Sequence, residues 1–228
     1  NKEPGYKIVN KLVEYLKNHH LTPALFFVFS RKETEKLAKS VQRGLVTSEE
    51  SAEIDNIFNY ELRNYKKLYE KSVQYNEIYS LLIKGVAYHH SGLVPILKEV
   101  IEILFEKGLI KVLFATETFA VGVNMPTKTV LFTGMKKFSG KGFRNLYSHE
   151  YTQMAGRAGR RGCDKVGHVI HLNNLFEQPL FNEYNMILNG KPQTLVSKFN
   201  VYYNLILNLI ANKEQHHNFT QTSINYGS

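Results

Sequence analysis

With 228 residues, 43% of them hydrophobic and 21% charged, the chain can bury a core as one large domain, alone or with an appendage. No run reaches the ~18 apolar residues of a membrane-spanning helix, and no charged-then-apolar leader follows Asn1, which argues against a membrane or secreted protein. The single cysteine, Cys163, excludes an internal disulfide and a thiolate zinc cage and favours a reduced, intracellular setting. Because the sequence starts without Met and stops in a polar tail, we expect a fragment of a longer protein.

Short apolar runs rich in β-branched and aromatic residues alternate with segments of helical spacing. In chain order, the pattern predicts a helix over 7–19, a strand over 24–30, a helix over 32–44, a helical stretch over 51–84, a strand over 86–90, a helix over 94–108, and strands over 111–116, 129–132 and 167–172. Strands buried on both faces and separated by helices indicate an α/β fold with an open parallel sheet flanked by helices. Ligands of such sheets meet the carboxyl ends of the strands, where we expect Ser30, His90, Thr116 and a basic loop over 136–145.

Two segments lie outside this alternation of strands and helices. The stretch over 51–84 is interpreted as a helical hairpin or one long helix packed on the sheet, in preference to a coiled coil that binds a partner. After Asn173 no further strand is expected, and helical patterns over 180–191 and 195–213 indicate a separate, incomplete module. The predicted division is therefore a domain over 1–175 and a helical extension with a polar tail over 176–228.

The net charge of +9 is concentrated in one part of the chain. Residues 128–165 hold nine Lys and Arg against Glu150 and Asp164, a net of +7 that leaves only +2 for the rest. Such a patch indicates a polyanionic partner, either nucleic acid or nucleotide phosphate, although a solvated Lys-rich loop is the simpler alternative.

The centre of this patch is QMAGRAGRRG, over 153–162. Arg157 and Arg160 are three residues apart, so on a helix both side chains would lie on one face, and Gly156 and Gly159 would let a ligand approach closely. Planar guanidinium groups match phosphate oxygens, so the pair could grip a γ-phosphate as arginine fingers; a surface helix or a generic RNA-binding motif is the alternative. The sequence holds no G-x-x-x-x-G-K-[ST] phosphate loop and no paired-acid strand, so a nucleotide would need its main seat elsewhere.

Together these motifs resemble those of the second RecA-like domain of superfamily 2 helicases, and within them those of the Ski-like DExH-box RNA helicases. QMAGRAGRRG is similar to their motif VI, ATETFAVGVNMP (115–126) to motif V, and FVFSRKE (27–33) to motif IV. HHSGLVPILKEVIEILFEKG (89–108) resembles the segment before motif V, and NVYYNLILNLI (200–210) resembles the start of the winged-helix or ratchet-helix region. The resemblance implies a RecA-like open parallel β-sheet with a C-terminal helical extension.

The resemblance also implies roles for individual residues. Catalytic groups would be Gln153, Arg157 and Arg160, which would reach ATP and Mg²⁺ held mainly by an absent first RecA-like domain. Residues beside the nucleotide would be Gly122, Asn124 and Gly156, although GVNMP could simply be a turn between helix and strand. Nucleic-acid contacts would come from Ser30, Arg31, His90, Ser91, Gly92, Thr116 and Glu117. One of the adjacent histidines would pack inside, and we expect no metal site there.

The implied function is half of the motor of an ATP-dependent RNA helicase, a nucleoside-triphosphate hydrolase, with the isolated fragment inactive. The implied partners are single-stranded RNA, the first RecA-like domain of the same chain and an RNA-degradation complex, with no membrane. The alternatives are a DNA helicase of the same branch and a non-catalytic RecA-like module that binds nucleic acid. The loop over 136–145, with Phe138 and Phe143 between charges, either lines the RNA path or touches the partner domain.

Overall fold

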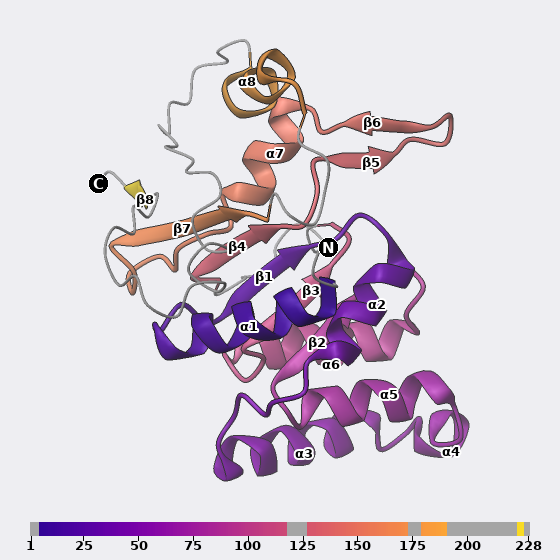
Figure 1. Ribbon diagram of the computed structural model, residues 1–228. Coiled ribbons are helices and arrows are strands. Elements are labelled where there is room, and N and C mark those ends of the chain that lie inside the picture. The colour runs from indigo at the N-terminus through magenta and orange to yellow at the C-terminus, as the bar shows by residue number, and fades with distance from the viewer. Residues whose placement is uncertain (1–4, 118–126, 173–178, 191–222, 226–228) are drawn as a thin grey trace.

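A computed structural model describes residues 5–117, 127–172, 179–190 and 223–225, and its centre is a six-stranded sheet (Figure 1). The strands are β1 (Ala24–Phe27), β2 (Val86–His89), β3 (Val112–Ala115), β4 (Thr129–Phe132), β7 (Val166–His171) and β8 (Ser223–Asn225). Their order is β2-β3-β1-β4-β7-β8; the first five run parallel, and β8 pairs antiparallel with β7. All residues of β1, β3 and β4 are buried, as expected for strands covered on both faces.

The register brings the ends of the parallel strands to two common edges. Phe27 lies opposite Ala115 and Phe132, and His89 also lies opposite Ala115. Because all these strands run the same way, the segments that follow them begin side by side at the carboxyl edge of the sheet. The expected placement of Ser30, His90 and Thr116 at that edge is confirmed.

Helices flank the sheet, and two of them form a hairpin at one end of the molecule. The helices are α1 (Gly5–Asn18), α2 (Arg31–Ser40), α3 (Ser48–Leu62), α4 (Lys66–Tyr69), α5 (Val73–Leu82), α6 (Pro95–Glu106), α7 (Ser148–Ala155) and α8 (Phe181–Asn189). In Figure 1, α3 and α5 lie side by side at the end of the molecule farthest from α8, where α3 packs against α6 and α5 against β2. Of the two forms expected for 51–84, the structure adopts the helical hairpin.

The core is continuous and aromatic at its centre. The rings of Phe26 and Phe114 stack with centroids 4.7 Å apart, and the ring of Phe27 lies 5.5 Å from that of Phe132. Leu12 and Leu16 of α1 and Val100, Ile101 and Leu104 of α6 are fully buried against this layer. Among the described residues no helix is long and apolar enough to cross a membrane.

Three sequence-based expectations were wrong in detail. The helix expected over 32–44 ends at Ser40, because Val41 takes an extended conformation. The basic loop over 136–145 forms a hairpin of β5 (Lys136–Phe138) and β6 (Phe143–Asn145), which turns at Gly140 and Gly142 with φ of 82° and 149°. The strand β8 follows Asn173, where none was expected. The predicted helix over 195–213 lies outside the described residues, and the boundary at 175 stays a prediction.

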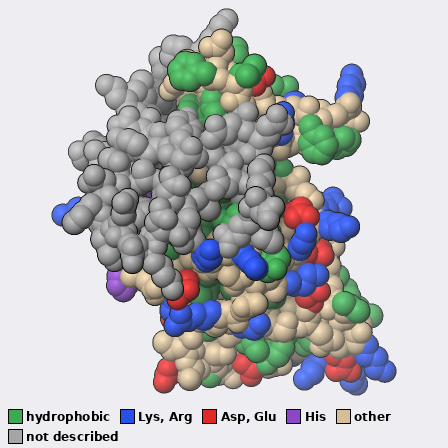
Figure 2. All heavy atoms as spheres, in the orientation of Figure 1, with side chains coloured by type: hydrophobic (Ala, Val, Ile, Leu, Met, Phe, Trp, Pro, Cys, Tyr) green, Lys and Arg blue, Asp and Glu red, His purple; other side chains and the backbone are tan. Residues whose placement is uncertain are grey.

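The hairpin of β5 and β6 projects from the sheet and carries exposed apolar surface. Phe138 and Phe143 are 59% and 75% exposed and meet edge to face, with ring centroids 5.6 Å apart. Figure 2 shows apolar and basic side chains together on this projection. At its base, Arg144 donates two hydrogen bonds to Glu150 in the first turn of α7, at 2.6 and 3.1 Å. The hairpin is therefore tied to the helix that leads into the arginine-rich segment.

Candidate functional site

The arginine-rich segment over 156–165, here called the arginine loop, is not helical. The helix α7 ends at Ala155, Gly156 caps it, and Gly159 takes a φ of 88° between the two arginines. A left-handed residue reverses the course of the backbone, so the expectation that Arg157 and Arg160 share one helical face was wrong. Gln153 is exposed on α7, Gly156 is exposed at its end, and Arg157 and Arg160 are half-buried in the loop.

A glycine in β7 lets the backbone of this loop pack directly against the sheet. Ala158 is fully buried, and a Cβ on Gly167 of β7 would lie 2.4 Å from the Ala158 carbonyl oxygen and 2.8 Å from the Gly159 nitrogen. No side chain fits in that space, so the loop backbone lies directly on β7. Sequence reasoning missed Gly167, because a glycine within a strand pattern indicates a close approach without naming the partner.

Arg160 is held by a carboxylate that sequence reasoning also missed. Its Nε and Nη2 donate to Oδ2 and Oδ1 of Asp164 at 2.8 and 2.9 Å, and its backbone N–H donates to Oδ2 at 2.9 Å. The Asp164 side chain is only 6% exposed, whereas that of Arg160 is 33% exposed. Hydrogen bonding between them raises the pKa of Arg160 and lowers that of Asp164, so both stay ionised. The spacing of four residues between Arg160 and Asp164 was the sequence signal that could have indicated this ion pair.

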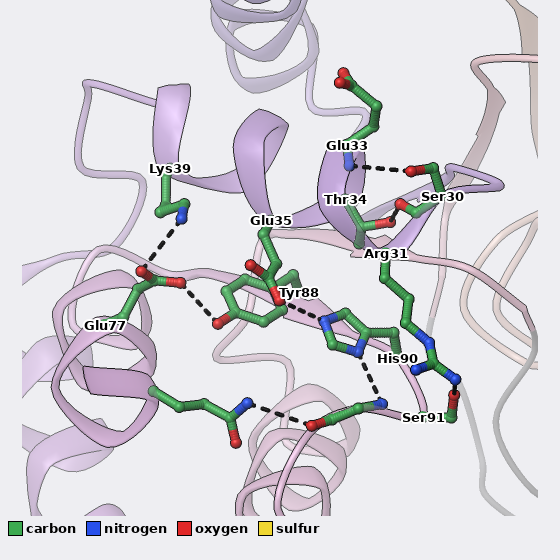
Figure 3. A network of polar contacts seen from close by, with 12 residues as sticks. Ser30, Arg31, Glu33, Thr34, Glu35, Lys39, Glu77, Tyr88, His90 and Ser91 are labelled. Carbon is green, nitrogen blue, oxygen red and sulfur yellow. Dashed lines mark hydrogen bonds and ion pairs between the residues drawn. The ribbon is translucent and has the colours of Figure 1, made fainter. Parts of the chain in front are cut away.

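A second polar cluster lies at the carboxyl edge of the sheet (Figure 3). Ser30 follows β1 and caps α2, where its hydroxyl accepts a hydrogen bond from the Glu33 N–H at 3.3 Å. Arg31 donates from Nη2 to the hydroxyl of Ser91, which follows β2. The structure thus brings Ser30, Arg31, Ser91 and Gly92 to one exposed place, from segments about 60 residues apart.

His90 lies beneath this cluster and is only 4% exposed. The Gly92 N–H donates to its Nδ1 at 2.9 Å, so Nε2 carries the proton and donates to Glu35 Oε1 at 2.8 Å. The imidazole stacks on Tyr88, with ring centroids 5.5 Å apart. Since the ring is buried, any role of His90 in binding has to act through Gly92.

The network continues away from the edge and fixes the turn from behind. The Tyr88 hydroxyl donates to Glu77 Oε1 at 2.8 Å, and Lys39 pairs with Glu77 Oε2 at 3.2 Å. Burial, and then the neighbouring Glu77 carboxylate, raises the pKa of Tyr88, which therefore stays a neutral donor. Gln74 of α5 accepts from the Val94 N–H at 2.9 Å. The helical hairpin thus supports the turn over 90–94.

The two adjacent histidines have different partners. His89 Nε2 lies 3.0 Å from Glu102 Oε1 on α6, and burial lowers the pKa of His89 to about 4. Thr116 is half-buried and donates its backbone N–H to the His89 carbonyl at 3.3 Å, while Glu117 is exposed. Gly122 and Asn124 lie outside the described residues.

The arginine loop and the polar cluster occupy opposite edges of the sheet. The loop leads into the amino end of β7. Lys128, which precedes β4, adds there to the effect of Arg160 in lowering the pKa of Asp164. Ser30, Ser91 and Thr116 follow the carboxyl ends of β1, β2 and β3. For four-residue strands the edges are separated by on the order of 13 Å.

An open, mostly parallel sheet with flanking helices and polar groups at its edges defines an open α/β domain, of the class whose ligands meet the ends of the strands. The chain belongs to the helicase conserved C-terminal domain family, which matches residues 7–162. This match includes both the polar cluster and most of the arginine loop, and it ends just before Asp164.

Curated relatives agree with this family. The chain is 44% identical over 210 residues to "Antiviral helicase SKI2" of Saccharomyces cerevisiae, which covers 91% of this chain and 16% of that protein. It is 42% identical over 211 residues to "Exosome RNA helicase MTR4" of Homo sapiens (92% and 20%), and 44% identical over 207 residues to "ATP-dependent RNA helicase mtr4" of Schizosaccharomyces pombe (90% and 18%). The chain thus spans a fifth or less of the length of these three relatives.

Proposed function

We propose that this chain is one of the two motor domains of an ATP-dependent RNA helicase. It supplies arginines to ATP that another RecA-like domain holds, and it grips the backbone of single-stranded RNA. The observation that carries this proposal is that two separate sets of groups whose chemistry suits phosphate oxygens, the arginine loop and the polar cluster, lie at opposite edges of one parallel sheet. The names of the relatives, which include two RNA helicases, support RNA as the nucleic acid.

The arginine loop suits a nucleotide held from the other side. Arg157 and Arg160 offer planar guanidinium groups to phosphate oxygens, and exposed Gln153 and Gly156 leave room for a second domain. Among the described residues no three His, Cys, Asp or Glu side chains could hold a metal ion together. We assign Mg²⁺ to the nucleotide phosphates and the other domain, where it would neutralise developing charge. The residues Gly122 and Asn124 remain proposed neighbours of the nucleotide.

The polar cluster suits a phosphodiester backbone. Arg31 supplies charge, the hydroxyls of Ser30 and Ser91 supply donors, and the exposed Gly92 lets a strand approach closely. Thr116 and Glu117 follow the neighbouring strand, with Thr116 donating to a phosphate and Glu117 linking to other protein groups. Such contacts hold a strand without reading its sequence, as a translocating motor requires.

ATP binding would close the two domains and bring Arg157 and Arg160 to the γ-phosphate. Closure would also shift the grip of the polar cluster along the strand, and hydrolysis would reopen the cleft. Because one of the relatives is named an exosome RNA helicase, we also propose that the intact protein works with an RNA-degradation complex.

The test is Arg160→Ala in the intact protein. Loss of the arginine finger should reduce RNA-stimulated ATP hydrolysis by on the order of 10³–10⁵ and leave RNA affinity largely unchanged. The isolated chain should hydrolyse almost no ATP. Survival of hydrolysis in the variant, or robust turnover by the isolated chain, would contradict the proposal.

Unwinding of matched duplexes with RNA or DNA overhangs identifies the substrate. We expect activity on the RNA overhang to exceed that on DNA. The reverse preference would assign the chain to a DNA helicase of the same branch.

A further inference from the structure

The three arginines of the arginine loop differ in how they are held. Arg160 donates three hydrogen bonds to the Asp164 carboxylate, two of them from Nε and Nη2. No side-chain hydrogen bond or ion pair to any described residue is found for Arg157 or Arg161, and Arg161 is exposed. Of the three guanidinium groups, only that of Arg160 therefore has a defined orientation in the described part of the chain.

The contact uses one edge of the guanidinium plane and leaves the other. With Nε and Nη2 facing Asp164, Nη1 keeps its two N–H groups, and no described residue accepts from them. Asp164 is almost fully buried while a third of Arg160 stays exposed, so the carboxylate lies on the protein side of the pair. The remaining N–H groups match two oxygens of a phosphate.

The backbone around Arg160 would not orient this side chain by itself. Gly159 and Gly162 both have positive φ, at 88° and 78°, and glycine constrains the chain least of all residues. The Asp164 N–H donates to the Arg160 carbonyl at 2.9 Å, which closes the loop into a compact turn. Asp164 thus binds Arg160 through its backbone and through its side chain.

We infer that Asp164 is a positioning residue for phosphoryl transfer: it holds the guanidinium of Arg160 edge-on, with Nη1 directed to the γ-phosphate of the incoming nucleotide. This inference rests on the proposed function, in which Arg160 is an arginine finger. A finger oriented before the nucleotide arrives loses less side-chain entropy in the transition state than a free one. The ionised state of Asp164, whose pKa is lowered by Arg160, keeps the contact intact near neutral pH.

The experiment is Asp164→Asn in the intact protein, with ATP hydrolysis measured at saturating RNA. The amide removes the charge and replaces one acceptor by a donor that faces an arginine N–H. We expect kcat to fall by on the order of 10–100-fold, with little change in the KM for ATP or in RNA affinity. Affinity for ADP with aluminium fluoride should fall in parallel, and affinity for ADP should not. Asp164→Glu, which retains the charge, should recover part of kcat.

Arg161→Gln is the matched control, since it removes one charge from the same loop at an exposed position without a contact in the described structure. It should leave kcat within about twofold, as surface changes usually do. The decisive comparison is the double variant Arg160→Ala with Asp164→Asn. If Asp164 acts through Arg160, the double variant should be no slower than Arg160→Ala alone.

Independent, additive effects of the two changes would overturn the inference, as would an unchanged kcat in Asp164→Asn. If Arg160→Ala itself keeps full hydrolysis, the proposed function fails instead, so the two failures are distinguishable. RNA affinity reports folding of each variant. If Asp164→Asn does not fold, Asp164→Glu replaces it in the double-variant comparison, made with and without Arg160→Ala.

Discussion

Arg31 and Ser91 are separated by 60 residues, yet they form one contact at the carboxyl edge of the sheet. Ser91 and Gly92 owe their position to His90 beneath them, whose Nδ1 accepts the Gly92 N–H. The proton on Nε2 is fixed by Glu35, a residue of α2. A buried imidazole thus shapes the turn that would meet a phosphate, although almost none of its own surface is exposed.

This arrangement predicts different losses of RNA affinity for two substitutions at His90. Phe would keep the stacking on Tyr88 but would leave the Gly92 N–H and Glu35 without their partner, whereas Asn could still accept from the Gly92 N–H. We expect His90→Phe to weaken RNA binding by about tenfold and to reduce its salt dependence by about one phosphate contact. His90→Asn should retain more of the affinity.

Titration of RNA affinity against salt concentration measures both effects. Equal affinity losses in the two variants, with the salt slope unchanged, would mean that His90 serves folding alone.

At the scale of elements, the site depends on how three of them meet. The helix α7 begins after the β5–β6 hairpin, where Glu150 binds Arg144, and ends at Ala155. The arginine loop then lies against β7 through the space that Gly167 leaves. Strand, helix and hairpin therefore position the arginines together, although the arginines themselves occupy no regular element.

Gly167→Ala tests this contact. The new Cβ would meet backbone atoms of Ala158 and Gly159 at 2.4–2.8 Å, and backbone cannot move aside as a flexible side chain can. We expect a loss of about 1–3 kcal/mol in the free energy of unfolding, together with slower ATP hydrolysis in the intact protein. Gly44→Ala is the control, because nothing lies within 4 Å of its added Cβ. Denaturant unfolding measures the stability of both variants. If Gly167→Ala is as stable as Gly44→Ala, the close approach of the arginine loop to Gly167 is excluded.

At the scale of the whole molecule, the charge and the core are distributed differently. Both acids of the basic window, Glu150 and Asp164, are engaged by arginines, so the positive charge of the remaining Lys and Arg is not neutralised within it. The core, by contrast, is continuous from the helical hairpin to α8. His171 of β7 lies 2.9 Å from the hydroxyls of both Tyr151 on α7 and Tyr184 on α8. These buried contacts join α7, the helix that leads into the arginine loop, to the start of the predicted extension.

Burial of histidines makes the stability of the whole domain depend on pH. Burial lowers the pKa of His171 to about 3 and that of His89 to about 4, from an ordinary value of 6.5. Between pH 6.5 and these values the unfolded chain binds protons that the folded chain does not. The free energy of unfolding should therefore fall as the pH drops below 6.5, by up to about 1.4 kcal/mol per pH unit for each histidine.

Denaturant unfolding between pH 7 and 5 measures this slope over the range in which the histidines of the unfolded chain become protonated. His171→Gln should make the slope shallower, and His149→Gln, at an exposed histidine, controls for the loss of a histidine as such. A slope that is unchanged in His171→Gln would refute the assignment.

The sequence by itself determined the five parallel strands, most helices and the family resemblance, but not the β5–β6 hairpin or β8. These follow from periodicity and from motifs that lie within single segments, such as the apolar runs of β1 and β4 and the order of FVFSRKE and QMAGRAGRRG. Candidate site residues could be proposed for the same reason, since arginine, serine and glycine in short motifs indicate phosphate chemistry.

Only the tertiary structure decided how those residues are held. The pairing of His90 with Glu35 and the contact between Arg31 and Ser91 join segments that meet only through crossovers of the sheet. The approach of Gly167 to Ala158 depends on how the arginine loop folds back onto β7. Local pattern carries no information about such encounters, because it reports which face a residue occupies and not what lies opposite. The loop conformation at Gly159 was hidden for a related reason: helical spacing of arginines is the same whether or not the backbone between them is helical.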